Sequence, residues 1–170
     1  MTHNHTNLKK IAHALLEKNE TVAVAESVTA GYLQNALSQM PNASNFFEGG
    51  ITAYTPEIKI KLLKVNPVEA ERENCVSQHI AEVMASHARE LFNSHWSVAI
   101  TGYAKPVPES GHRLYAYYCI IYLGKIISSE KIELSGTLNP LEAQQKYVEK
   151  IWNDLAAKVD LYAKTSQHNN

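Results

Sequence analysis

Polar side chains follow three apolar, strand-like runs of the sequence, and their types could together attack a carbonyl group. Ser27 lies just after the run Thr21–Ala25, and Tyr54 ends a second run. Thr101–Gly102 follow a third run, Trp96–Ile100. In open α/β sheets, ligands bind beyond the carboxyl ends of the strands, so neighbouring parallel strands would bring these groups into one cleft. A serine hydroxyl there can attack a carbonyl carbon when a base accepts its proton.

Ser27 has two interpretations. It lies between a buried strand and a helix that the sequence predicts from Thr29 to about Gln39. The start of such a helix offers unpaired N–H groups and a partial positive charge, which can stabilise an oxyanion or hold a phosphate. Serine is also a preferred N-cap residue, so Ser27 could instead be a helix cap without a catalytic role.

Tyr54 and Lys59 place a phenol and an amine five residues apart, around a helix predicted to begin at Pro56. A partly desolvated Lys59 could act as a base or lower the pKa of Tyr54. The alternative is a solvated lysine and a tyrosine that packs at the end of its strand.

The elements that must position these residues alternate between helices and strands. Apolar spacing and turn signals predict helices over 8–16, 29–39, 56–63, 78–92 and 139–162, and strands over 21–25, 51–54, 96–100, 114–123 and 125–134. Gly49–Gly50 is interpreted as a turn or bulge that feeds the second strand. Ser77 is the expected N-cap of one helix, and Asn139–Glu142 resembles a capping box at the start of another.

This order predicts an α/β fold, a three-layer α/β/α sandwich with a mixed β-sheet. We expect a single domain over residues 1–165 and a polar tail over 166–170. The length of 170 residues and the 45% hydrophobic and 19% charged content agree with one globular domain.

Charge and hydropathy exclude several function classes. Lys and Arg together number 16, and Asp and Glu together number 17, so the chain lacks the basic excess of a nucleic-acid-binding protein. Apolar runs such as 116–123 are too short to cross a membrane, and the polar start has no signal-peptide core. We therefore expect a cytoplasmic protein without nucleic-acid or membrane partners.

The cysteines and histidines lack the spacing of metal ligands. Cys75 and Cys119 form no CxxC pair, and the eight histidines form no HExxH motif. Gly49–Gly50 begins no phosphate-binding P-loop, because no GxxxxGK[ST] pattern follows. We expect no metal and no cofactor.

Taken together, the motifs resemble the family of the C-terminal domain of the competence/damage-inducible protein CinA, which also occurs alone as nicotinamide-nucleotide amidase. The family pattern AES-C-T-G-G is similar to Ala25–Gly31, and its GG-x-x-x-Y-x-x-x-x-K segment is similar to Gly49–Lys59. Its AVS-helix segment resembles Cys75–Ser77, and its TG-x-AGP loop resembles Thr101–Pro106. The matches occur in order over about residues 8 to 160.

The resemblance implies deamidation of nicotinamide mononucleotide to nicotinate mononucleotide without a metal. Ser27 would be the nucleophile, and Tyr54 and Lys59 would assist proton transfer. Backbone amides near Thr29–Gly31, or in the Thr101–Gly102 loop, would stabilise the oxyanion. The implied substrate-binding residues are Glu26, Thr29, Ala30, Gly31, Gly50, Thr101, Gly102 and Lys105. The partner would be a pyridine nucleotide or a related carboxamide, and a homodimer is compatible with this function.

The sequence also departs from the family pattern. Ala30 replaces a glycine and Val28 replaces a cysteine, while Lys105 introduces a charge into the glycine-rich loop 101–111. Lys105 could block the pocket or contact a phosphate. The segment 135–138 lacks the family's arginine, which is suited to an anionic group. The alternative function is therefore a catalytically silent paralogue that acts as a ligand-binding or protein-interaction domain.

Overall fold

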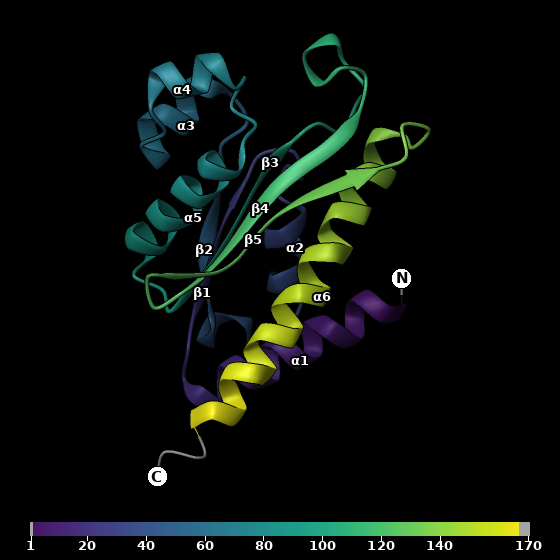
Figure 1. Ribbon diagram of the computed structural model, residues 1–170. Helices are drawn as coiled ribbons and strands as arrows, with labels where there is room; N and C mark the ends of the chain where they lie inside the picture. The colour runs from purple at the N-terminus through teal and green to yellow at the C-terminus, as the bar shows by residue number, and fades with distance from the viewer. Residues whose placement is uncertain (1, 167–170) are drawn as a thin grey trace.

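A mixed, five-stranded β-sheet forms the middle layer of the chain (Figure 1). The computed structural model describes residues 2–166. The strands lie in the order β2-β1-β3-β4-β5, with β1 parallel to β2 and β3, and β4 antiparallel to β3 and β5. Their bounds are β1 (Val22–Glu26), β2 (Phe47–Thr52), β3 (Trp96–Gly102), β4 (Leu114–Tyr122) and β5 (Lys125–Leu134).

Helices cover both faces of the sheet, so the predicted three-layer α/β/α sandwich is confirmed. One face packs against α1 (Thr2–Lys18), α2 (Tyr32–Ser38) and α6 (Pro140–Ser166). The other packs against α5 (Gln78–Phe92), with α3 (Pro56–Leu63) and α4 (Pro67–Arg72) beyond it. Two short 3₁₀ helices complete the elements, η1 (Ala43–Asn45) and η2 (Pro108–Ser110).

Strand β1 is buried along its whole length, as expected for a central strand of a parallel sheet. Successive side chains alternate between the two cores, so that Val22 and Val24 face α1 and α6 while Ala25 faces α5. Alanines on α5 meet the small side chains of this face, and the hydroxyl of Ser97 donates to the carbonyl of Ala85 at 2.8 Å. Because β1 pairs in parallel with both β2 and β3, the carboxyl ends of these three strands lie at one edge of the sheet.

Two predicted helix starts are confirmed by their caps. The hydroxyl of Ser77 accepts from the N–H of Ile80 at 3.1 Å, which caps α5. Asn139 and Glu142 form the reciprocal capping box of α6, with bonds of 3.0 and 2.9 Å between side chain and backbone. Helix α6 continues through Ser166, the first residue of the predicted tail, and 167–170 lie outside the described residues.

The glycine pair lies inside β2 rather than before it. The register of β1 against β2 shifts between Val22 and Ala23, which gives the predicted bulge beside Gly49 and Gly50. A Cβ on Gly50 would lie 2.5 Å from Cγ2 of Val24, so glycine is needed there for close approach to the neighbouring strand. In the part of the chain that the structure describes, no helix has the length and apolar content to cross a membrane.

Candidate functional site

A cleft of about 370 Å³ lies at the edge of the sheet where the three parallel strands end. Ser27, Tyr54 and Thr101 all line it, so the expected meeting of three strand ends is confirmed. The remaining wall comes from the segment between α4 and α5, from the loop after β3 and from the start of α6. The lining residues are Ser27, Val28, Tyr54, Pro56, Lys59, Asn74, Cys75, Val76, Thr101, Gly102, Tyr103, Ala104, Lys105, Val107, Pro140 and Gln144.

Ser27 and Thr101 supply the two aliphatic hydroxyl groups among these lining residues. The backbone of Ser27 fixes its position. Its N–H donates to the carbonyl of Ile100 at 3.1 Å, which fixes Ser27 to the end of β3. The side chain is 7% exposed, and its hydroxyl makes no hydrogen bond with any residue that the structure describes. Helix α2 begins only at Tyr32, with Gly31 as its N-cap, so the interpretation of Ser27 as a helix cap is wrong. The hydroxyl is therefore free for a ligand.

Glu26, which is fully buried, caps α2 in place of Ser27. Its carboxylate accepts hydrogen bonds from the backbone N–H groups of Gly31, Leu33 and Gln34 at 3.1, 3.0 and 2.8 Å. It also accepts one from the hydroxyl of Thr29 at 2.6 Å. These four donors compensate the buried charge at a helix end that favours anions. Glu26 thus orients the turn that follows Ser27.

Of the backbone amides near Thr29–Gly31 that were predicted as oxyanion donors, those of Ala30 and Gly31 are already occupied. The N–H of Gly31 is occupied by Glu26, and that of Ala30 donates to the carbonyl of Ser27 at 3.1 Å. Within the described chain, the N–H groups of Val28 and Thr29 have no such partner. The available donors therefore lie one or two residues after Ser27, closer than the start of α2.

Lys59 is the buried basic group of the cleft, with 2% of its side chain exposed. Among the described residues, its Nζ has one hydrogen-bond acceptor, the backbone carbonyl of Tyr54 at 3.2 Å. Burial lowers the pKa of Lys59 below its usual value, and Coulombic attraction from Cys75 and Glu57 opposes this only in part. The amine is therefore more easily deprotonated than a surface lysine, as a general base requires.

Tyr54 lies in the cleft lining with 67% of its side chain exposed. Lys59 donates to the backbone carbonyl of Tyr54, and the described residues show no hydrogen bond between the Lys59 amine and the Tyr54 phenol. The phenol is thus positioned to meet a ligand at the mouth of the cleft.

Cys75 is a cleft residue to which sequence reasoning gave no role. Burial raises the pKa of its thiol, and the positive charge of Lys59 opposes the shift. A protonated thiol is a poor nucleophile, which leaves Ser27 as the better candidate. Cys75 has a left-handed backbone, with φ of 58°, and its carbonyl accepts the hydroxyl of Thr101 at 2.7 Å. The Thr101 hydroxyl therefore fixes the position of Cys75 in the wall of the cleft.

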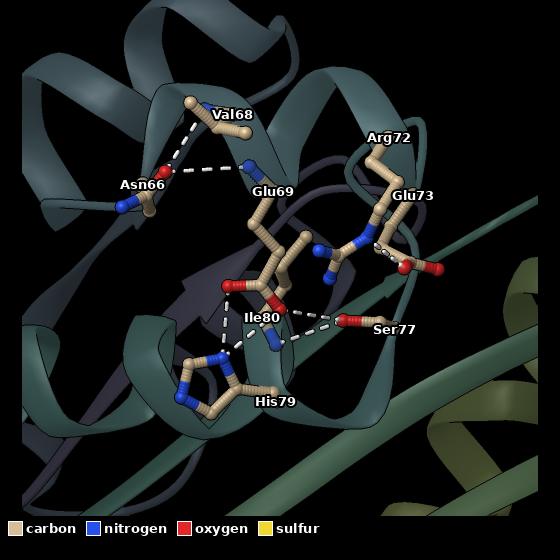
Figure 2. Close-up of polar contacts among 8 residues, drawn as sticks. All are labelled: Asn66, Val68, Glu69, Arg72, Glu73, Ser77, His79 and Ile80. Atoms are coloured by element: carbon tan, nitrogen blue, oxygen red, sulfur yellow. Dashed lines mark hydrogen bonds and ion pairs between the residues drawn. The ribbon is translucent and has the colours of Figure 1, made fainter.

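The segment that carries Cys75 is fixed by polar contacts between α4 and α5 (Figure 2). Figure 2 shows the carboxylate of Glu69 pointing to His79 and Ser77, with oxygen distances of 2.9 and 3.4 Å. Asn66 caps α4 by accepting from two backbone N–H groups at 2.9 and 3.3 Å. These bonds join the starts of both helices and so set the position of the connecting segment 74–76 in the cleft wall.

The predicted site residues divide into two groups. Those that line the cleft are Ser27, Tyr54, Lys59, Thr101, Gly102 and Lys105, and those that do not are Glu26, Thr29, Ala30, Gly31 and Gly50. Gly102 also permits close strand packing, since a Cβ there would lie 2.4 Å from that of Ala116. Gly50 packs beneath Gln34, whose side chain a Cβ would approach to 2.8 Å. Over the described part of the chain, no three His, Cys, Asp or Glu side chains gather as a metal site.

Ala30 has a left-handed backbone, with φ of 51°, where the family pattern has glycine. We expect Ala30→Gly to raise the free energy of unfolding by about 0.5–1 kcal/mol, because it relieves this strain at a smaller entropic cost. Ala157→Gly, on an exposed position inside α6, should instead lose about 1 kcal/mol. Urea unfolding monitored by circular dichroism measures both, and a loss of stability in Ala30→Gly would contradict the expectation.

Comparison with known proteins shows which family the chain belongs to. A family model described as the CinA C-terminal domain matches residues 4–150. The chain belongs to this family. A CinA-like protein from Thermosynechococcus vestitus is 41% identical to this CinA-family chain over 122 residues, which is 72% of the chain. The chain spans about 29% of the length of that relative.

Solved structures agree with the CinA-family fold. A competence or damage-inducible protein from Enterobacter asburiae has a TM-score of 0.85 and 26% identity, and the match covers 92% of this chain and 98% of that one. A CinA superfamily protein from Klebsiella pneumoniae has a TM-score of 0.85 and 23% identity, over 92% and 98% of the two chains, which supports the fold alone. The mixed sheet described above is thus the fold of CinA-family domains.

Proposed function

We propose that this CinA-family domain is an amidohydrolase that removes ammonia from the carboxamide of nicotinamide mononucleotide. The observation that carries the proposal is the presence of an unpartnered serine hydroxyl and a buried amine in one cleft. Ser27 would be the nucleophile and Lys59 the general base. A desolvated amine can act as the base that accepts a hydroxyl proton, so the two residues supply a nucleophile and a base to one cleft.

In the first step, the Oγ of Ser27 attacks the carboxamide carbon while its proton passes to the amine of Lys59. The tetrahedral intermediate carries its negative charge on the former carbonyl oxygen. The ammonium of Lys59 then returns this proton to the amide nitrogen, directly or through the phenol of Tyr54, and ammonia leaves while the amine of Lys59 becomes neutral again. A water molecule, deprotonated by the same base, hydrolyses the Ser27 ester and releases the carboxylate product.

The backbone amides of Val28 and Thr29 are the proposed oxyanion donors. Both follow the nucleophile and have no hydrogen-bond partner within the described residues. Gln144 of α6 supports this turn, because its amide donates to the carbonyl of Val28 at 2.9 Å. Loss of one oxyanion donor costs about 10²–10³-fold in kcat where it has been measured in a protease, so the geometry of this turn controls the rate.

Aromatic side chains favour a planar substrate. Tyr54 and Tyr103 lie in the lining of the cleft. The phenol oxygen of Tyr103 accepts from the side-chain amide of Asn74 at 3.0 Å, which orients the ring. Ring faces at this position can stack on a pyridine ring.

The test is an assay of ammonia release from nicotinamide mononucleotide, with chromatography of the nucleotide product. We expect nicotinate mononucleotide and ammonia in equal amounts, at a rate that EDTA leaves unchanged. Absence of ammonia from folded protein would overturn the proposal. Nucleotide binding without turnover, measured by calorimetry, would then support the alternative of a silent, ligand-binding paralogue.

A further inference from the structure

The charges that line the cleft have one sign. Lys59 and Lys105 are its only Lys or Arg residues, and no Asp or Glu is part of the lining. Lys59 is almost fully buried, whereas Lys105 is exposed to solvent. Lys105 is therefore the positively charged side chain that an incoming ligand can reach from solvent. A cleft lined by one sign of charge attracts ligands of the opposite sign.

Lys105 extends from a loop whose backbone is fixed on both sides. Before it, the N–H of Tyr103 donates to the carbonyl of Tyr115, and the hydroxyl of Tyr147 donates to the carbonyl of Tyr103, both at 2.9 Å. After it, Pro106 restricts the backbone of Lys105 to extended conformations. A pre-ordered backbone lowers the entropic cost of binding, so an ammonium group at this position suits ligand recognition.

The same loop is braced beyond the proline. The hydroxyl of Ser110 donates to the carbonyl of Val107 at 3.0 Å and accepts from its N–H at 3.3 Å. Helix η2 lies at this turn, and Gly111 ends it with φ of 60°. These bonds hold the loop, and the Lys105 side chain has no hydrogen bond or ion pair with a residue that the structure describes, so its ammonium is available to a ligand.

Lys105 leaves the cleft open. Lys105 is exposed, and it is part of the lining of a cavity that keeps a volume of about 370 Å³. The sequence left two roles open for Lys105, either blocking the pocket or contacting an anionic group of a ligand. This geometry favours the contact with an anionic group. Ser27 is 7% exposed, and its hydroxyl therefore lies deeper than the lysine at the rim.

We propose that Lys105 binds an anionic group of the substrate, so that the enzyme selects a carboxamide that carries a phosphate over its neutral counterpart. This inference rests on the proposed function and adds the residue that recognises the phosphate of the substrate. The carboxamide meets Ser27, and the phosphate contacts the ammonium of Lys105 at the rim. Lysine binds phosphate as a point charge, through rotatable donors.

The experiment compares nicotinamide mononucleotide with nicotinamide riboside, which lacks only the phosphate. For Lys105→Met, we expect KM for the mononucleotide to rise about 10–100-fold, as for loss of a charge-assisted hydrogen bond. Its kcat, and kcat/KM for the riboside, should stay within about twofold. Lys105→Arg should restore most of the loss. Lys125→Met, at the opposite end of the sheet, is the matched control and should leave kcat and KM for both substrates unchanged.

The outcomes separate the two proposals. Equal kcat/KM of the native protein for both substrates, or equal losses for both in Lys105→Met, would overturn the role of Lys105 and leave the amidase proposal standing. If no ammonia is released, calorimetry with the same two compounds replaces the assay. Weaker binding of the mononucleotide alone in Lys105→Met would then support the anion contact although the amidase proposal fails.

Discussion

Replacement of Lys59 by methionine is expected to abolish most of the turnover while it makes the protein more stable. The amine sits in an almost fully buried position with one backbone carbonyl as acceptor. Methionine fills a similar volume without a group that burial disfavours in its charged form. We expect ammonia release to fall about 10²–10⁴-fold, as for loss of a general base. The free energy of unfolding should rise by about 0.5–2 kcal/mol.

The stability gain in Lys59→Met should depend on pH. The pKa of Lys59 is lower in the folded chain than in the unfolded one, so the unfolded chain binds more protons between the two values. Native stability therefore rises with pH through this window, and the advantage of the variant should shrink. In the native enzyme, kcat/KM should rise over the lowered pKa of Lys59, because the neutral amine is the base.

Lys61→Met is the matched control for this prediction, because Lys61 lies two residues further along α3 and is exposed. It should leave turnover at the native rate, and it should change the free energy of unfolding by less than about 0.5 kcal/mol. Thermal unfolding at several pH values and the ammonia assay measure the two effects. Full turnover in Lys59→Met would exclude this amine as the base.

Replacement of Ser27 by alanine is expected to stop ammonia release, with a loss of about 10⁴–10⁶-fold in kcat. The hydroxyl has no hydrogen-bond partner among the described residues, so its removal leaves no buried donor or acceptor unpaired. Stability should therefore change by less than about 0.5 kcal/mol. A loss of activity without a loss of stability identifies a residue that acts on the substrate.

The control for Ser27→Ala is Ser44→Ala, since Ser44 is exposed and does not line the cleft. It should keep native turnover. The ammonia assay and urea unfolding of both variants decide the question. Ser27→Ala with native turnover would show that the nucleophile is another group.

The sequence predicted the layers of the fold and several helix starts because these follow from local patterns. Ser77 caps α5, and Asn139 begins the capping box of α6, as the spacing of their partners indicated. Helix α4 was not predicted, although Asn66 caps it, because its six residues are too short to show apolar periodicity. The spacing of Leu91 from Met84 and Ala88 predicts a core position, but Leu91 is 60% exposed because it lies near the end of α5.

The candidate site was predictable where it follows from strand ends, and was not where it depends on contacts between distant residues. Ser27, Tyr54 and Thr101 belong to the first kind. The sequence did not show that the start of α2 is occupied by Glu26, because the Glu26 carboxylate accepts hydrogen bonds from backbone N–H groups up to eight residues away. Gln144 reaches the Ser27 turn from 116 residues further along the chain, which no local pattern reveals.

A double-variant cycle tests most directly whether Ser27 and Lys59 act as one unit. Ammonia release from nicotinamide mononucleotide is measured for Ser27→Ala, Lys59→Met and the protein with both changes. If the amine serves only to activate the hydroxyl, the double variant should be no slower than Ser27→Ala alone, because groups that act together give non-additive losses. A double variant whose loss equals the product of the two single losses would show independent effects and contradict the account.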